Sequence, residues 1–278
     1  TRGWQPEDLI ILAARPSVGK TAFALNLIRN AAMNDIRPVP VAVWSLEMSV
    51  VSLVLRMLAA ESNVWLHKIQ TGRLNDAELM QIYQKGAEQL SKAKIFFDDA
   101  SSVSITSLRS KARRLKKKEN IGLIVIDYLQ LMSGEAKGNR EQEISTISRS
   151  LKQLAKELQI PIIALSQLSR DIEKRTGPNK RPQLSDLRES GAIEQDADVV
   201  MFLWGPSEEE IEMDRDLYGK RYVKIAKQRN GTLVTEEFDF KNEIQLFTSI
   251  DSMGKPNDGF ARPELPIEGS AIEEELPF

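Results

Sequence analysis

The sequence predicts an α/β fold: a mostly parallel central sheet flanked by helices, followed by C-terminal antiparallel strands. Two observations carry this prediction. Up to Trp204, continuous apolar runs of strand length alternate with longer segments of helical period, a pattern typical of parallel sheets covered on both faces. After Trp204 the apolar runs lie closer together, and two of them flank Asn230-Gly231, a pair that favours a tight turn between antiparallel strands.

Each element follows from its own apolar pattern. The expected strands of the parallel part are Leu9–Ala13, Val41–Ser45, Leu123–Asp127, Pro161–Ser166 and Asp198–Trp204, with an edge strand at Ile95–Phe97. The expected helices cover residues 20–34, 49–60, 75–93, 104–118 and 141–159. The last of these has the clearest helical period, with apolar residues at steps of three and four. The antiparallel strands are expected at Tyr222–Ala226, Leu233–Phe240 and Ile244–Thr248.

The composition is that of a globular protein. Of its 278 residues, 41% are hydrophobic and 28% charged, which suits one large α/β domain with an ordinary core. No apolar run approaches the roughly 18 residues of a membrane span, and the first residues lack a signal-sequence pattern. The absence of cysteine excludes disulfides and thiolate metal sites. These features favour a cytoplasmic protein without membrane partners.

Charge is distributed unevenly along the chain. The formal net charge is -2. From Lys255 onward there are six acidic and two basic residues, which leaves a net charge of +2 on residues 1–254. That balance argues neither for nor against nucleic-acid binding. The last 25 residues also lack any period. We therefore expect a folded domain over 1–250 and a disordered acidic tail over 251–278, which acts as a solubilising segment or docks on a replication partner through its terminal Phe278.

A phosphate-binding loop follows the first expected strand. The segment Ala14-Arg15-Pro16-Ser17-Val18-Gly19-Lys20-Thr21 has the strand–loop–helix context of a Walker A motif. In such a loop the backbone N–H groups surround phosphate, the lysine neutralises its β/γ oxygens and the threonine hydroxyl binds Mg²⁺. A helix start without a ligand is the alternative. We expect ATP to be bound by Arg15, Ser17, Val18, Gly19, Lys20 and Thr21.

Three other expected strands end in polar residues suited to phosphoryl transfer. Asp127 has the Walker B position, where it binds the nucleotide and holds Mg²⁺ together with Thr21. Glu47 is expected to activate the attacking water, and Gln167 to sense the γ-phosphate. In a parallel sheet these groups converge on one edge. The alternatives are that Asp127 and Glu47 only cap local turns and that Gln167 only ends its strand.

These motifs, in this order and spacing, resemble the DnaB family of replicative helicases. Beyond the phosphate loop, the matching stretches are Ser45–Met48, Val125–Met132, Ala164–Arg170, Ser185–Asp198 and Ala226–Gly231. The resemblance covers residues 1–250, and the family often carries alanine at position 14. It implies a RecA-like P-loop NTPase that uses ATP and Mg²⁺. Six such domains form a homo-hexameric ring, which moves 5′ to 3′ on single-stranded DNA and unwinds the duplex at the replication fork.

The resemblance also implies roles for residues outside the phosphate loop. Arg188, Glu189 and Gly191 line the central channel and contact the DNA backbone. Lys227 and Arg229 act in trans on the γ-phosphate of a neighbouring subunit, and the position of Arg229 before a turn suggests that it projects from a hairpin tip. Primase, a helicase loader and other replisome proteins are partners of the full-length protein. The family's N-terminal helical domain and linker helix are absent from this sequence.

Two other functions fit parts of the sequence. A RecA-like recombinase that forms filaments would share the ATP site but would not unwind DNA. A nucleotide-gated scaffold would bind ATP without turnover stimulated by single-stranded DNA. The basic segment 109–118 lies on a helix whose other face is apolar, so we expect its charges to face solvent rather than DNA. The single histidine, His67, is expected to be structural.

Overall fold

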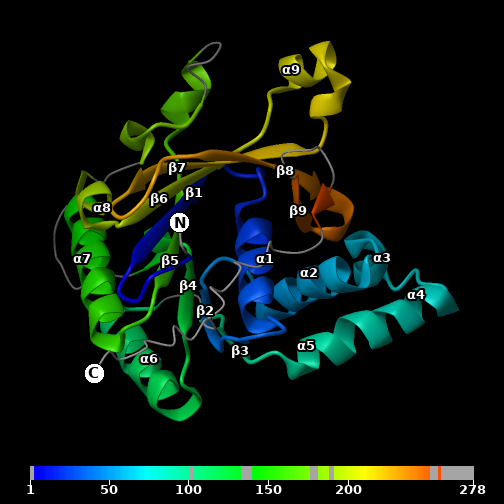
Figure 1. Cartoon of the computed structure of the whole chain (residues 1–278), viewed down its shortest axis with the longest axis horizontal. Helices are drawn as coiled ribbons and strands as arrows, with labels where there is room; N and C mark the ends of the chain where they lie inside the picture. Colours follow the sequence, from blue (N-terminus) through cyan, green and yellow to red (C-terminus); the bar gives the residue numbers. More distant parts are fainter. Residues whose placement is uncertain are drawn as a thin grey trace, which may run out of the picture.

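The computed structural model describes residues 3–100, 103–132, 140–175, 181–187, 191–250 and 256–257. Within them one ten-stranded sheet has the order β10-β9-β8-β7-β6-β1-β5-β4-β2-β3 (Figure 1). The strands are β1 (Leu9–Ala14), β2 (Val41–Ser45), β3 (Ile95–Asp98), β4 (Leu123–Asp127), β5 (Ile162–Gln167), β6 (Val199–Trp204), β7 (Lys220–Gln228), β8 (Thr235–Lys241), β9 (Leu246–Ile250) and β10 (Pro256–Asn257). Strands β1 to β6 pair in parallel and β6 to β10 pair antiparallel, which confirms the expected fold class.

The parallel strands form the core of the domain. β1, β2 and β4 are buried at every residue, as expected for strands covered on both faces. The side chains of each strand alternate between two apolar clusters, one on each side of the sheet. This arrangement fixes the register, because a one-residue slip would exchange the two faces.

Helices cover the sheet on both sides (Figure 1). They are α1 (Lys20–Ala32), α2 (Val50–Ser62), α3 (Leu66–Thr71), α4 (Asp76–Gln81), α5 (Glu88–Lys92), α6 (Ile105–Glu119), α7 (Arg140–Leu158), α8 (Gly191–Asp196) and α9 (Glu208–Met213). Apolar residues of α6, α7 and α8 share one cluster with the sheet, and those of α1 and α2 share the other. No helix among the described residues is long and apolar enough to span a membrane.

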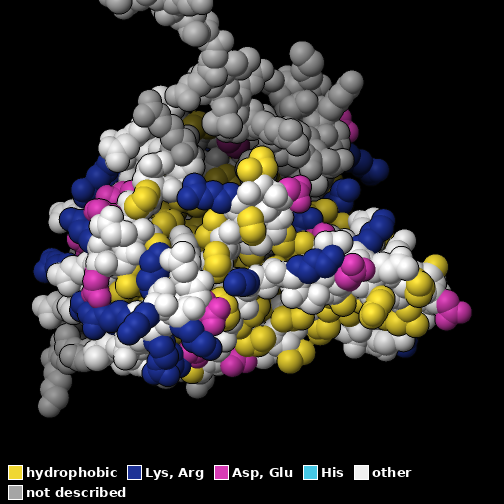
Figure 2. Space-filling view, turned by 60° about the horizontal axis from the view of Figure 1, so that its bottom comes forward, with side chains coloured by type: hydrophobic (Ala, Val, Ile, Leu, Met, Phe, Trp, Pro, Cys, Tyr) yellow, Lys and Arg dark blue, Asp and Glu magenta, His cyan; other side chains and the backbone are white. Residues whose placement is uncertain are grey.

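The expected helix over 75–93 is interrupted. A π-helical segment, η1 (Ile82–Ala87), separates α4 from α5. Gly86 in this segment packs closely on α2, because a Cβ at Gly86 would lie 3.1 Å from a methyl group of Leu58. The α3–α5 region extends to one side of the domain (Figure 1), and apolar side chains gather on its surface (Figure 2). Leu79, Met80 and Tyr83 of this region are exposed.

The basic helix α6 buries the apolar face that its sequence predicts and leaves its charged residues outside that face. Ile105, Leu108 and Ala112 are buried against the sheet. Beside this buried face, Arg109 and Arg113 pair with Glu157 of α7. Lys and Arg side chains gather on this part of the surface (Figure 2). Local ion pairs and solvent therefore account for these charges.

The turn between β7 and β8 differs from the expected tight hairpin. β7 continues to Gln228, which pairs with Val199 of β6, whereas β8 begins only at Thr235 and pairs with Lys224. The connection is therefore a loop over residues 229–234, with Asn230 in its first turn. The strand is longer than expected because its end pairs with β6 rather than with β8. At the C-terminus, β10 pairs Pro256 with Ile250; the rest of the expected tail lies outside the described residues.

Candidate active site

The candidate nucleotide site lies at the carboxyl edge of the parallel strands. The strand register places Ala14 of β1 beside Gln167 of β5, and Ser45 of β2 beside Asp127 of β4. Parallel strands end at a common edge, so the loop after β1 meets the polar ends of β2, β4 and β5 there. The predicted convergence of the phosphate loop with Glu47, Asp127 and Gln167 is therefore observed.

Gly19 allows the loop to turn into α1. Its φ of 106° lies in the left-handed region, which strongly favours glycine. A Cβ there would also come within 3.3 Å of the rings of Phe240 and Phe247. No side chain caps α1, so its first amide groups are available to an anion. Ser17 is exposed at the crest of the loop with a φ of 64°.

Lys20, Thr21 and Asp127 form the centre of the site. The Thr21 hydroxyl donates a hydrogen bond of 2.8 Å to Asp127 Oδ2, and Lys20 Nζ lies 3.7 Å from Asp127 Oδ1. Burial lowers the pKa of Lys20, while the negative charges of Asp127 and Glu47 oppose that shift. The contact between Thr21 and Asp127 joins two motifs that are distant in the chain, which argues against a merely local capping role for Asp127.

Asp127 also offers an oxygen suited to a metal ion. Its Oδ1 is buried and accepts no hydrogen bond, and the ion pair with Lys20 at 3.7 Å leaves it able to accept a closer partner. Mg²⁺ prefers oxygen ligands and usually combines one or two protein groups with water and phosphate. The Asp127 carboxylate and the adjacent Thr21 hydroxyl fit such an ion. Among the described residues there is no cluster of three or more His, Asp or Glu that could hold a metal by itself.

Glu47 is exposed just beyond the end of β2. Its position is fixed through Leu46, whose N–H donates to the carbonyl of Asp127 at 2.7 Å. The carboxylate is close enough to raise the pKa of both Lys20 and Tyr128, although burial is the larger influence on each. The cap of α2 is Ser49, which accepts a hydrogen bond from Ser52 N. Glu47 is therefore not required for that cap.

Gln167 is linked to the Walker B segment through a residue that the sequence did not single out. Gln130, three residues after Asp127, accepts a 3.4 Å hydrogen bond from Gln167 N and donates one of 2.9 Å to Ser166 Oγ. Leu168 N then donates to the carbonyl of Ala14. The end of β5 is thus joined both to the strand before the phosphate loop and to the segment after β4.

Arg15 contacts protein groups on its side of the loop. Its Nε donates to Glu173 Oε1 at 2.9 Å and its Nη1 to the carbonyl of Leu168 at 2.8 Å. Glu173 lies in η3 (Arg170–Lys174). The loop is also braced by Arg221 of β7, whose Nε donates to the carbonyl of Val18. A cavity of about 650 Å³ adjoins Arg15 and Val18.

Arg56 and Tyr128 are further residues near the site that sequence reasoning missed. Arg56 of α2 donates to Gln245 Oε1 at 2.7 Å and is near enough to Asp127 and Glu47 for both charges to raise its pKa against the lowering effect of burial. The Tyr128 ring centre lies 4.5 Å from Lys20 Nζ. The available signal for Arg56 was a lone basic residue in an otherwise largely apolar helical segment.

Lys227 and Arg229 lie at the opposite end of the parallel strands, where β1 and β6 begin. Gln228 pairs with Val199, the first residue of β6, and Asp198 N bonds the carbonyl of Leu9 at the start of β1. The six residues of β1 separate this end from the phosphate loop by about 16 Å. These two cations are therefore far from the nucleotide site of their own chain.

Arg229 does not project freely from a hairpin tip as expected. Its side chain folds back onto the end of α8 and donates to the carbonyl of Gln195 at 2.8 Å. Of the residues expected to contact DNA, Arg188 and Glu189 lie outside the described residues. Gly191 is exposed and begins α8.

Comparison with known proteins gives a consistent result. Residues 1–249 match the family model for the DnaB-like helicase C-terminal domain. The chain is 48% identical over 255 residues to the replicative DNA helicase DnaB of Geobacillus stearothermophilus, which aligns with 90% of this chain. It is 44% identical over 263 residues to DnaB of Haemophilus influenzae, which aligns with 94% of this chain. The chain spans about half the length of these relatives, 54% and 55%.

Solved structures show the same similarity. The ATPase domain of G40P has a TM-score of 0.81 and 36% sequence identity, with 90% of this chain and 87% of that chain covered. A DnaB-like replicative helicase, solved in a study of its interactions with primase, also has a TM-score of 0.81 and 36% identity, with 88% of this chain and 58% of that chain covered. The chain belongs to the DnaB-like helicase C-terminal domain family.

Proposed function

We propose that this chain is the ATP-hydrolysing motor domain of a replicative DNA helicase. The observation that carries the proposal is the meeting of Lys20, Thr21, Glu47 and Asp127 at one sheet edge in a chain of the DnaB-like family. These are the groups that phosphoryl transfer needs: a phosphate-binding cation, oxygen ligands for Mg²⁺, and a carboxylate for the attacking water.

The residues divide this work according to their surroundings. Bound Mg²⁺–ATP supplies the phosphoanhydride bond that hydrolysis breaks. The open amides at the start of α1 bind phosphate oxygens, and Lys20, held near Asp127, neutralises their charge. Thr21 and Asp127 hold the metal ion. Glu47, exposed beside Lys20, orients the attacking water and accepts its proton.

Ser17, Val18 and Gly19 contribute backbone groups of the loop, whereas Arg15 supports the loop through Glu173 and Leu168. Gln167 is proposed as the γ-phosphate sensor, because its hydrogen bond with Gln130 connects it to the Walker B segment. A change at the phosphate can thereby reach η3 and the residues that follow it.

The opposite placement of Lys227 and Arg229 supports a role in trans. About 16 Å of strand separates them from their own phosphate loop, so they can complete only the site of another subunit. A homo-hexameric ring closes such head-to-tail contacts. Arg188, Glu189 and Gly191 are proposed to contact the backbone of single-stranded DNA in its channel, which suits a 5′–3′ motor that must pass every sequence. Primase and a helicase loader are proposed partners of the full-length, cytoplasmic protein.

One measurement separates this function from its competitors. ATP hydrolysis by this chain is measured with and without single-stranded oligonucleotide, and the particle mass is determined in the same sample with a non-hydrolysable ATP analogue. The motor predicts stimulated turnover and a hexamer. Open filaments would favour a recombinase, and nucleotide binding without stimulated turnover would favour a scaffold.

A further inference from the structure

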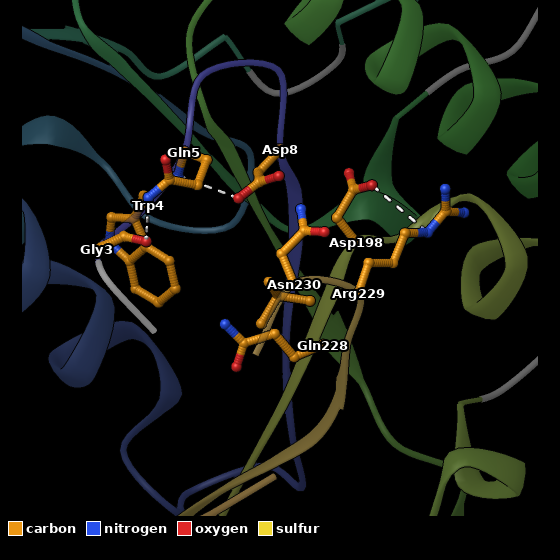
Figure 3. Close-up of a pocket in the computed structure, with 9 residues that line it drawn as sticks. Gly3, Trp4, Gln5, Asp8, Asp198, Gln228, Arg229 and Asn230 are labelled. Atoms are coloured by element: carbon orange, nitrogen blue, oxygen red, sulfur yellow. Dashed lines mark hydrogen bonds and ion pairs between the residues drawn. The ribbon is translucent and has the colours of Figure 1, made fainter. Parts of the chain in front are cut away.

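A buried carboxylate lies behind the two trans-acting cations. Asp198 is 6% exposed and precedes β6, beside a small cavity of about 140 Å³ that Trp4, Asp8, Arg229 and Asn230 help to line (Figure 3). Its Oδ2 accepts hydrogen bonds from Leu9 N at 2.8 Å and from Lys152 Nζ at 2.6 Å. Strand β1 and helix α7 therefore hold this carboxylate in one orientation.

The other carboxylate oxygen faces Arg229. Oδ1 lies 3.6 Å from Arg229 Nε, and the backbone carbonyl of Asp198 accepts from Arg229 N at 3.0 Å. Arg229 Nη2 donates to the carbonyl of Gln195. These contacts use only part of the five-donor guanidinium, and 52% of the side chain stays exposed. Its Nη1 makes no hydrogen bond within the described part of the chain and remains available to an anion.

Lys227 shares this support. Its Nζ donates to the carbonyl of Glu194 and lies 3.5 Å from that of Gln195. Both carbonyls belong to the last turn of α8, where the helix dipole favours cations. The two cations thus rest on one platform, formed by Asp198 and the end of α8. The other end of α8 is Gly191, itself one of the residues proposed to contact DNA.

We propose that Asp198 is a positioning residue for catalysis in trans: it holds Arg229 so that the free side of the guanidinium faces the phosphate bound by a neighbouring subunit. The inference rests on the proposed function. The inference also deepens the proposed function, because the platform joins the trans-acting cations to α8, the helix that begins at Gly191. A flexible arginine would have to be ordered in each cycle, whereas a held one is already oriented for the transition state.

The first experiment measures the order of the Arg229 side chain directly, on this chain without nucleotide. NMR relaxation of the Arg229 Nε–Hε group is compared in the wild type and in Asp198→Asn, which keeps the size and the backbone bond but removes the charge. We expect a rigid group that becomes mobile in the variant. A rigid Arg229 in Asp198→Asn, or a mobile one in the wild type, would overturn the inference.

Two matched variants separate positioning from general stability. Asp8→Asn removes another carboxylate from the same cavity (Figure 3), one that accepts from Gln5 N. Lys152→Met removes the structural partner of Asp198 but leaves the charge that faces Arg229. Arg229 should stay rigid in both, because in Lys152→Met the bond from Leu9 N still orients the Asp198 carboxylate. If Lys152→Met loosens Arg229 as much as Asp198→Asn does, the carboxylate acts only through the local fold, and the inference fails.

The second experiment tests where the effect acts. Turnover of Asp198→Asn with ATP and oligonucleotide should fall about 10-fold, with little change in KM, and loss of Arg229 itself should cost about 10³-fold. Mixing Asp198→Asn with an excess of Glu47→Gln chains should restore turnover per Asp198→Asn subunit, because its intact site then receives a correctly held arginine. No restoration would place the defect in the variant's own site and refute the inference. If instead Arg229→Ala keeps full turnover, the trans role within the proposed function fails, while the NMR result still decides what Asp198 does to Arg229.

Discussion

At the scale of single residues, the site depends on charges held close together under partial burial. Lys20 lies between Asp127, the Tyr128 ring and the charge of Glu47, and Asp127 keeps one oxygen without a hydrogen bond. A buried carboxylate oxygen that accepts no hydrogen bond is suited to a metal cation. The residue types were evident from the sequence, whereas their mutual burial is a property of the fold.

Glu47→Gln should retain nucleotide binding and lose turnover. The substitution keeps the shape of the side chain but removes the carboxylate that accepts the proton of the attacking water. Loss of such a general base should lower the rate of hydrolysis by about 10²- to 10⁴-fold. Affinity for a fluorescent ATP analogue and steady-state hydrolysis measure the two properties separately. Undiminished hydrolysis would remove Glu47 from its proposed role.

The charge of Lys20 should be lost at a lower pH than that of an ordinary lysine. Burial lowers the pKa of Lys20 below its usual value of 10.5. As the pH rises, the ammonium therefore loses its proton earlier than an ordinary lysine does, and affinity for a triphosphate should fall over the same rise in pH. Asp127 acts in the opposite direction. An NMR titration of Lys20 should therefore show a still lower midpoint in Asp127→Asn. An unchanged or higher midpoint would contradict this account of the site.

At the scale of elements, the helices are positioned by apolar faces that pack on the sheet. α7 buries Ile144, Ile147, Leu151, Leu154 and Leu158, the same five residues whose spacing predicted the helix. For elements with such strong periodicity, the ends expected from the sequence lie within two residues of the observed ends. The short helices α8 and α9 and strand β10 were not expected. The π-segment η1 and the loop over 229–234 also depart from expectation, because they depend on contacts with α2 and β6 that local sequence patterns do not contain.

Leu151→Ala should destabilise the domain by about 2–5 kcal/mol. Leu151 is fully buried in the cluster between α7 and the sheet, so truncation removes apolar contacts and leaves a cavity. Chemical denaturation followed by circular dichroism measures the change in the free energy of unfolding. Arg149→Ala, on the exposed side of the same helix, is the control and should change it by less than about 0.5 kcal/mol. Equal effects of the two substitutions would contradict the assigned helix face.

At the scale of the whole molecule, one sheet carries two groups of polar residues, one at each end of its parallel strands. The carboxyl end bears the phosphate loop, Glu47 and Asp127, and the other end bears Lys227 and Arg229. After Gln167, the segment η3 contacts the phosphate loop through the hydrogen bond between Arg15 and Glu173. Helix α8, which begins at Gly191, supports Lys227 and Arg229 through its last carbonyls. If the proposed function holds, this layout would let DNA contact influence two nucleotide sites at once.

Two inactive variants should therefore restore activity when mixed. Lys20→Ala lacks its own nucleotide site but keeps Arg229, and Arg229→Ala has the reverse defect. In mixed assemblies the intact site of an Arg229→Ala subunit meets the intact arginine of a Lys20→Ala neighbour. Single-stranded-DNA-stimulated hydrolysis of the mixture should exceed that of either variant by at least about 10-fold. A simple average of the two rates would exclude catalysis in trans.

The sequence by itself determined the fold class, most helices and strands, and the chemical groups of the nucleotide site, because apolar period and the Walker A and B patterns are local properties of the chain. The tertiary structure alone decided which distant groups support them. Gln130 beside Gln167, Arg56 near Glu47, Glu173 on Arg15 and Asp198 behind Arg229 arise from strand order and register. Those depend on how the two faces of the sheet are buried together, and no short stretch of sequence specifies them.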